Sequence, residues 1–414
     1  MDNAQASIVT IGDELLIGQT VDTNSAWLGS QLNQIGIWVR RRVAVGDKKD
    51  DILQVLEQEG HESNIVLITG GLGPTADDIT KPVLCDFFGG TLVTHQPTKR
   101  HVEEIFRTRG LVMLQRNIDQ SLVPSSCQVL FNRMGTAPGM WFCKNDVVFI
   151  FLPGVPLEMK TIMLDFGLDK LKSMGISRTI LHRTLLTTGM GESFVAERLT
   201  DFEKSLGHSL SLAYLPGGGL LKLRLTQKLD VPQSDFTKLS AKFDELKSIL
   251  HDIAVYDEDI PLEELVGRQL KKLNITVSTA ESCTGGLLAH KITSVPGSSD
   301  YFQGSLVAYS NRIKKALLHV PLKVLEQFGA VSEETVLHMA SAAQELFETD
   351  MAIAVSGIMG PGGGANDKPV GTVWLAVKYQ GISLTQKHML RYDRPTNTLW
   401  TVNYALCLAL KVLG

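Results

Sequence analysis

The sequence predicts a multidomain α/β protein. The chain has 414 residues, more than one hydrophobic core ordinarily serves, so we expect two or three domains. Strand and helix patterns alternate near the N-terminus and again near the C-terminus, and a segment of different pattern lies between them. These observations predict an N-terminal domain over residues 1–170, a connecting module over 171–255 and a C-terminal domain over 256–414.

In the N-terminal segment, the buried-strand pattern of Ala6–Ile11 begins an alternation of strands with amphipathic helices. Such alternation predicts a parallel sheet with helices on both faces, whose ligands bind beyond the carboxyl ends of the strands. Further strands are expected at 39–45 and 64–69, and helices at 23–32, 49–58 and 77–88.

The middle segment predicts a small α+β module, and the acidic stretch Tyr256–Pro261 after it marks a domain boundary. The C-terminal segment returns to alternating strands and helices. In the module we expect strands at 183–188, 210–214 and 220–229 and helices at 193–206 and 233–253. In the C-terminal domain we expect strands at 275–279, 304–310, 351–356, 371–379 and 382–391, and helices at 261–273, 284–294, 311–318, 332–348 and 395–412.

The composition excludes several classes of function. Forty basic and 44 acidic side chains give a net charge of -4, so the chain carries no overall positive field for nucleic acid. The five cysteines are scattered, which fits neither a disulfide framework nor a zinc site. The N-terminus has no signal-peptide pattern, and the longest apolar runs are too short to cross a membrane. We expect a soluble cytoplasmic protein without nucleic-acid or membrane partners.

The segment Ala280–Gly286, with the sequence AESCTGG, is the most informative in the chain. It follows a β-branched run and precedes an amphipathic helix, a geometry that presents a nucleophile where helix N–H groups stabilise negative charge. Ser282 is therefore a candidate for acyl transfer, and Thr284, Gly285 and Gly286 are candidate substrate contacts. A plain helix start is the alternative for the same residues.

Ser282 needs a base, and Lys314 in the next predicted helix is the candidate. A lysine acts as a base only when its amine is neutral, which burial away from carboxylates favours by lowering the pKa. Tyr309 and Asn311 are expected at the same sheet edge. The alternative is that Lys314 belongs to a solvated helix face. Cys283 is a rival nucleophile, because a thiol at a helix N-terminus is acidified, and the sequence leaves this choice open.

A glycine-rich loop follows the strand that ends near Ser356. Such a density of glycine is expected where backbone N–H groups approach an oxyanion or a phosphate, and a flexible crossover is the alternative. Arg391 and Arg394 follow the last strand, and a guanidinium suits a phosphomonoester because it binds two oxygens at once. The candidate glycines of the loop are Gly360, Gly362 and Gly363.

These motifs, together with Gly329–Glu334, resemble the CinA C-terminal family over the whole C-terminal domain. The resemblance implies hydrolysis of nicotinamide mononucleotide to nicotinate mononucleotide and ammonia, without a cofactor. It also implies that Ser282 is the nucleophile, that Lys314 is its base, and that Tyr309 assists in orientation or proton transfer. An arginine at 391 or 394 would then assist the substrate.

The chain departs from the usual pattern of that family at three positions. Ser356 stands where the family usually has Thr, so the hydroxyl remains but the methyl group that restricts its rotamer is lost. Met359 replaces the usual Ala, and His319 replaces a usual Gly. These changes affect the expected shape of the pocket rather than its chemistry.

Two loops of the N-terminal domain carry a second candidate site, Ile11–Leu16 after the first strand and Thr69–Asp78 after the third. A glycine-rich loop that enters a helix can hold an oxyanion on its amides, and Asp77 and Asp78 are candidate ligands of Mg²⁺ or Co²⁺. Helix capping is the alternative for both acids. The glycine spacing is not a dinucleotide fingerprint, and there is no Walker lysine. The candidate nucleotide contacts are Gly12, Asp13, Glu14, Asp22, Asn24, Gly70, Gly71, Gly73, Thr75, Lys81 and Glu158.

This N-terminal domain resembles the molybdopterin-binding, MogA/MoaB-like fold at the start of full-length CinA proteins, and the segment around Thr188–Glu192 resembles their KH-like module. The first resemblance implies metal-dependent ADP-ribose pyrophosphatase activity. A composition so poor in basic residues argues against RNA binding by the KH-like module. The family resemblance also implies a homodimer.

We therefore expect a bifunctional hydrolase of pyridine-nucleotide metabolism, whose substrates are nicotinamide mononucleotide and ADP-ribose. Two alternatives stay open. The first is a competence- or damage-related protein that binds pterin or nucleotide ligands without turnover. The second is a protein of which only the C-terminal domain is active.

Overall fold

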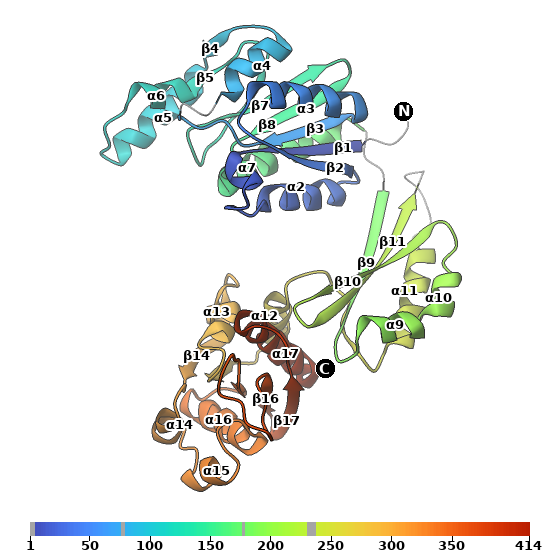
Figure 1. The fold of residues 1–414 in the computed structure, drawn as a ribbon, viewed down its shortest axis with the longest axis vertical. Helices are drawn as coiled ribbons and strands as arrows, with labels where there is room; N and C mark the ends of the chain where they lie inside the picture. Colours follow the sequence, from blue (N-terminus) through green and yellow to red (C-terminus); the bar gives the residue numbers. More distant parts are fainter. Residues whose placement is uncertain (1–4, 76–78, 176–178, 230–236) are drawn as a thin grey trace. The chain divides into compact units, whose positions relative to one another are not determined.

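The computed structural model describes residues 5–75, 79–175, 179–229 and 237–414 (Figure 1). The chain divides into two compact units, Met1–Ile180 with Lys228–Ser234 and Leu181–Gln227 with Asp235–Gly414. Among the helices in the described ranges, none is long and apolar enough to cross a membrane.

A six-stranded sheet forms the centre of the first unit. Its strands are β1 (Gln5–Ile11), β2 (Trp38–Val45), β3 (Ile65–Thr69), β6 (Gln128–Leu130), β7 (Gly139–Lys144) and β8 (Val147–Leu152), in the order β2-β1-β3-β8-β7-β6. Strands β2, β1, β3 and β8 are parallel to one another, whereas β7 pairs antiparallel with β8 and β6. The sheet is thus mixed rather than wholly parallel, because Asn145 and Asp146, with φ of 51° and 63°, form a tight hairpin turn between β7 and β8.

Helices cover both faces of this sheet, because successive strand residues point to opposite sides. Ile8 packs with Leu28, Ile162 and Leu171 on one face, and its neighbour Val9 belongs to the core of the other face. The helices are α1 (Asp13–Leu16), α2 (Thr23–Gln34), α3 (Lys49–Glu62), α4 (Thr80–Phe88), α5 (Gln96–Thr108), α6 (Gln115–Ile118), α7 (Pro156–Ile162) and α8 (Leu168–Ser173), and the short strands β4 (Leu92–Thr94) and β5 (Leu122–Pro124) pair with each other.

The second unit begins with the small α+β module. Its sheet has the order β10-β11-β9-β12, and a shared core that includes Leu185, Leu223 and Phe243 joins it to three helices. The expected helix at 193–206 is interrupted at Leu199, whose φ of -98° and ψ of 3° end the first helix. The elements are β9 (Thr179–Thr187), α9 (Glu192–Arg198), α10 (Thr200–Lys204), β10 (Leu210–Gly217), β11 (Leu220–Leu229), α11 (Thr237–Ile249) and β12 (Ala254–Tyr256).

The rest of the second unit is a five-stranded sheet with helices on both faces. Its strands are β13 (Val277–Glu281), β14 (Phe302–Val307), β15 (Met351–Gly357), β16 (Thr372–Tyr379) and β17 (Ile382–Met389), in the order β14-β13-β15-β16-β17. Strand β13 lies between β14 and β15 and is parallel to both, and β16 and β17 complete the sheet as an antiparallel hairpin. The helices are α12 (Leu262–Leu273), α13 (Leu287–Thr293), α14 (Asn311–Leu317), α15 (Leu322–Gln327), α16 (Glu333–Leu346) and α17 (Arg394–Leu413).

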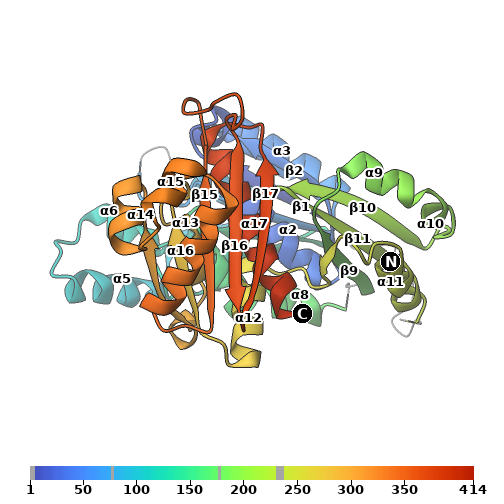
Figure 2. The ribbon, with the colours of Figure 1, turned by 90° about the horizontal axis from the view of Figure 1, so that it is seen from below.

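The two faces of this sheet have separate cores. Val277 and Val355 pack with α12, α13 and α17, whereas Ala280 and Ala354 pack with residues of α16. Figure 2 shows α16 lying across the strands β15 and β16. The small alanines on the second face allow that helix to approach the sheet closely.

Candidate active site

The register of the sheet brings the predicted C-terminal residues together. Glu281 at the end of β13 is paired with Val307 at the end of β14 and with Val355 near the end of β15. Because the three strands are parallel, the residues that follow them emerge at one edge of the sheet. Ser282, Tyr309 and Ser356 therefore lie beside one another, as the sequence predicted for this edge.

Lys314 and Ser282 are in direct contact. The Lys314 side chain is buried, and its Nζ lies 2.8 Å from Ser282 Oγ. The same amine donates to the carbonyl of Ala308 at 2.8 Å and to that of Tyr309 at 3.3 Å. Burial lowers the pKa of Lys314 to about 8, because desolvation disfavours the charged amine. Lys314 does not belong to a solvated helix face, so that alternative is wrong.

Burial has the opposite effect on the pKa of the rival nucleophile Cys283, because desolvation disfavours the thiolate. Its side chain is buried, and burial raises the pKa of its thiol to about 12. A thiol with such a pKa is almost wholly protonated at neutral pH, and the thiol is a far weaker nucleophile than the thiolate. The structure therefore favours Ser282 over Cys283, a choice that the sequence left open.

The expected helix N-terminus at Ser282 is displaced along the chain. Helix α13 begins only at Leu287, because Gly285 and Gly286 have φ of 61° and 101°, a left-handed conformation that does not continue a helix. The N–H groups of the helix start are also occupied: the buried Glu281 carboxylate accepts from Gly286 at 2.9 Å, Leu288 at 3.1 Å and Ala289 at 2.8 Å. Glu281 thus occupies the N-terminus of α13. The prediction that the N–H groups of this helix stabilise negative charge beside Ser282 is wrong.

An arginine closes one side of the site. Arg394 at the start of α17 donates to the Tyr309 hydroxyl at 2.8 Å and to the Gly360 carbonyl at 2.9 Å. Tyr309 is itself 60% exposed, so this side of the site faces solvent. Arg391 is exposed and lies outside the site, which distinguishes the two predicted arginines.

A cavity of about 260 Å³ adjoins Ser282 and Lys314. Most of the predicted residues line it, namely Ser282, Tyr309, Asn311, Lys314, Ser356, Gly360, Gly362, Gly363 and Arg394. Thr284, Gly285, Gly286 and Arg391 are not among its lining residues, so their predicted substrate contacts are not supported by this geometry. Sequence reasoning missed the wall formed by Ala330, Val331 and Ile358, because apolar residues after a strand or before a helix give no chemical signal.

The three departures from the family pattern are compatible with this site. The Ser356 hydroxyl is buried and donates to the Ala330 carbonyl at 2.7 Å, so it fixes a wall of the cavity. Met359 lines the cavity. His319 has a φ of 49°, a left-handed conformation that glycine adopts without strain.

The predicted N-terminal site also lies at the carboxyl edge of its sheet. A cavity of about 360 Å³ there is lined by the glycine-rich loop after β3 and by residues that follow β1 and β8. Gly70 cannot carry a side chain, because a Cβ at its φ of 109° would lie 2.1 Å from the Ile11 carbonyl oxygen. The predicted residues that line this cavity are Glu14, Asp22, Asn24, Gly70, Gly71 and Gly73.

The other predicted N-terminal residues have different neighbours. Asp13 and Asp47 exchange hydrogen bonds between their backbone N–H groups and carboxylates, and the Gly12 N–H donates to the Val45 carbonyl. The buried Lys81 amine donates to the Gln120 carbonyl at 2.9 Å. Five predicted residues do not line the cavity, namely Gly12, Asp13, Thr75, Lys81 and Glu158. The predicted metal ligands Asp77 and Asp78 lie outside the described residues.

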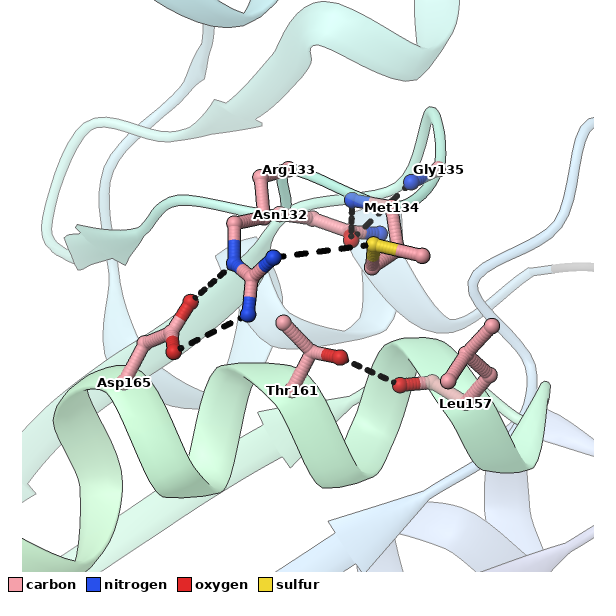
Figure 3. Close-up of polar contacts among 7 residues, drawn as sticks. All are labelled: Asn132, Arg133, Met134, Gly135, Leu157, Thr161 and Asp165. Atoms are coloured by element: carbon pink, nitrogen blue, oxygen red, sulfur yellow. Dashed lines mark hydrogen bonds and ion pairs between the residues drawn. The ribbon is translucent and has the colours of Figure 1, made fainter. Parts of the chain in front are cut away.

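Glu158 belongs to a separate polar cluster. Its carboxylate accepts from Asn132 Nδ2 at 2.7 Å, and burial raises the pKa of Glu158. Figure 3 shows how Asn132 and its turn are held in place. Asn132 Oδ1 accepts from the N–H groups of Met134 and Gly135, and Arg133 is ion-paired with Asp165. This cluster fastens the 132–135 turn to α7 and the residues after it, and the nucleotide contact of Glu158 stays a prediction.

The geometry defines a three-domain α/β protein with a buried Ser–Lys pair in its C-terminal domain and a glycine-lined cavity in its N-terminal domain. Family models agree: "Probable molybdopterin binding domain" matches residues 7–173, "Damage-inducible protein CinA KH domain" 182–252 and "CinA C-terminal domain" 259–413.

Full-length relatives show the same family. A CinA-like protein from Cytophaga hutchinsonii is 48% identical over 397 residues, which is 96% of this chain and 95% of the relative. A CinA-like protein from Flavobacterium psychrophilum is 43% identical over 375 residues, which is 90% of each chain. The chain therefore belongs to the CinA-like protein family, and the predicted family and three-part α/β fold are confirmed.

Proposed function

We propose that the C-terminal domain hydrolyses the carboxamide of nicotinamide mononucleotide through an acyl-enzyme on Ser282. The observation that carries this proposal is the 2.8 Å contact between Lys314 Nζ and Ser282 Oγ, made by an amine whose pKa burial lowers to about 8. A lysine that is partly neutral near physiological pH is the base that an activated serine requires.

The two backbone carbonyls beside Lys314 support its role as a base. When the amine is neutral it keeps two N–H donors and gains one lone pair. The carbonyls of Ala308 and Tyr309 accept from Nζ, so they hold the two remaining N–H bonds. The lone pair is then directed at the third neighbour, the hydroxyl of Ser282.

The reaction balances with these two side chains and water. Lys314 takes the hydroxyl proton as Ser282 Oγ attacks the carboxamide carbon, and it returns the proton to the leaving nitrogen, so that the C–N bond breaks and ammonia departs. Water, deprotonated by the same amine, then attacks the ester, and the carboxylate leaves as Ser282 recovers its proton. The loop glycines Gly362 and Gly363 line the cavity and offer backbone N–H groups to the oxyanion.

The charge at the mouth of the cavity supports a phosphorylated substrate. Arg394 lines the cavity, and a guanidinium is suited to a phosphomonoester. Incubation of the full chain with nicotinamide mononucleotide tests the proposal. We expect ammonia and nicotinate mononucleotide in equal amounts. Binding of the nucleotide without either product would instead support a ligand-binding protein.

For the N-terminal domain we propose a nucleotide site whose ligand is ADP-ribose, cleaved at its diphosphate. The cavity beside Gly70 and Gly71 supports the binding part, because its backbone turns tightly around the end of β3. The described residues contain no group of three or more His, Cys, Asp or Glu placed to hold a metal ion. The predicted metal ligands Asp77 and Asp78 lie outside the described residues.

The test for the N-terminal site compares two glycine variants in the full chain. Gly70→Ala places a Cβ against the Ile11 carbonyl, whereas Gly89→Ala has a similar positive φ of 77° but open space around it. With ADP-ribose and Mg²⁺ or Co²⁺ we expect AMP and ribose 5-phosphate from the parent and Gly89→Ala chains, and loss of both from Gly70→Ala. Binding without products would leave only the C-terminal domain active.

We also propose that the chain forms a homodimer. Sedimentation of the same preparations tests this proposal, and it should give twice the monomer mass.

A further inference from the structure

Helix α17 fastens one wall of the candidate active site. Arg394 in its first turn bridges Tyr309 and Gly360. Asn397, one turn later and fully buried, donates to the carbonyl of Met359 at 3.2 Å and to that of Tyr392 at 2.8 Å. The position of the glycine-rich wall therefore depends on where α17 lies.

The same helix contacts the middle module farther along. Asn403 Nδ2 donates to the Gly218 carbonyl at 2.8 Å. Gly218 and Gly219 form the turn between β10 and β11, with φ of 61° and 82°. Asn403 is nine residues after Arg394, a rise of about 14 Å along a helix, so the hairpin turn reaches a helix that begins in the active site (Figure 1).

An aromatic cluster lies under this hairpin turn. A Cβ on Gly219 would be 2.8 Å from the Tyr404 hydroxyl and 3.0 Å from the Trp400 ring. Trp400 in turn packs on Tyr392 with ring centroids 4.3 Å apart, and Tyr392 lies two residues before Arg394. The hairpin is therefore in van der Waals contact with side chains that also pack beside the start of α17.

The contact is part of a continuous core. Leu186 of β9 is 3% exposed and belongs to the same apolar cluster as Val402 and Leu406 of α17, and Leu220 of β11 packs against that cluster. Close-packed interiors transmit small displacements instead of absorbing them. Because the hairpin and α17 share a packed core, a displacement of the hairpin is expected to displace α17 as well.

We infer that the β10–β11 hairpin of the middle module is a positioning element for the C-terminal site. It holds α17, and through α17 it holds Arg394 and the 359–360 segment at the cavity. The hairpin itself does not touch the cavity, so it acts through Arg394 and sets substrate affinity rather than the chemical step. The predicted effect on KM rests on the proposed amidase function. The packing of the hairpin on α17 does not depend on that function.

The test uses two glycine variants of the same module. Gly219→Ala places a Cβ against Tyr404 and Trp400, whereas Gly207→Ala has a comparable φ of 67° and nothing within 4 Å. For nicotinamide mononucleotide we expect Gly219→Ala to raise KM about tenfold with kcat changed less than about twofold, because mispositioned binding groups mainly weaken substrate binding. Gly207→Ala should match the parent chain.

Two further variants guard against misfolding and against a merely structural effect. Asn403→Ala removes only the hydrogen bond to Gly218 and should raise KM about threefold. Tyr404→Phe removes the hydroxyl that a Cβ at residue 219 would meet, so the double variant Gly219→Ala with Tyr404→Phe should have a lower KM than Gly219→Ala alone.

Hydrogen exchange of the segments 357–363 and 391–397 gives a readout that does not need activity. We expect faster exchange there in Gly219→Ala than in Gly207→Ala. Equal exchange and equal KM in the two variants would overturn the inference. Altered exchange together with no ammonia from the parent chain would support the positioning link and refute the amidase proposal.

Discussion

The guanidinium of Arg394 joins Tyr309 to the glycine-rich loop: one nitrogen donates to the Tyr309 hydroxyl at 2.8 Å and another to the Gly360 carbonyl at 2.9 Å. Tyr309 follows β14 and Gly360 follows β15, so one side chain connects segments from two strands. A planar guanidinium can satisfy two acceptors in fixed directions, which the single ammonium of lysine cannot do.

Arg394→Lys tests this bridge while keeping the charge. We expect KM for nicotinamide mononucleotide to rise about tenfold, because the substitution loses the two-point geometry. Arg391→Lys is the matched control, since Arg391 is exposed and does not line the cavity. Steady-state kinetics give KM for both variants. Equal KM values for Arg394→Lys and Arg391→Lys would exclude a role for the Arg394 bridge in substrate binding.

The rate should depend on pH through Lys314. Its pKa is lowered to about 8, and the neutral amine is the active form, so activity should be lost as the pH falls below that value. We expect kcat/KM to rise about tenfold per pH unit up to pH 7 and to level off above about pH 9. A pH–rate profile from pH 6 to 10 measures this. A flat profile would mean that Lys314 is not the base.

Cys283 should be dispensable for the chemical step. Its thiol is buried with a pKa of about 12, so Cys283→Ala should keep the rate within about threefold, and iodoacetamide should not inactivate the parent chain at neutral pH. The assay is ammonia release before and after alkylation. Loss of all activity in Cys283→Ala, with an intact fold by circular dichroism, would point to the thiol instead of Ser282.

Glu281 should contribute to stability through the turn that carries Ser282. Its carboxylate accepts three backbone N–H groups at the start of α13. Glu281→Gln replaces one acceptor oxygen by a donor and leaves a buried N–H unsatisfied, which costs about 1–3 kcal/mol. Urea unfolding of the C-terminal domain, with exposed Glu326→Gln as control, measures this loss. Equal midpoints would show that Glu281 does not hold the turn.

Much of the fold follows from local patterns in the sequence. The five buried residues of β3 and the cap of α2, where Asp22 accepts from the Ser25 N–H at 2.9 Å, are strong signals, and both elements were predicted. Helix α5 was missed because it is polar overall: only Thr98 and Val102 on it are buried, so few apolar residues mark the face that packs on the domain. The antiparallel hairpin of β7 and β8 was missed because Asn145-Asp146 is a less distinctive turn than one with glycine.

The site was predictable where chemistry is encoded in residue type. Ser282 and Lys314 carry reactive groups, and their meeting follows from parallel strands that end together. Their burial and the pKa of Cys283 depend on packing from distant segments, which no local pattern contains. The role of Glu281 left one usable signal, an acid at the end of a strand just before two glycines and a helix.

The assignment of Ser282 as the nucleophile is tested most directly by ammonia release from nicotinamide mononucleotide by Ser282→Ala, compared with the parent chain. The variant should be slower by about a thousandfold or more, because no acyl-enzyme can form, and it should still bind the nucleotide. Ammonia release by Ser282→Ala at the parental rate would show that Ser282 is not the nucleophile.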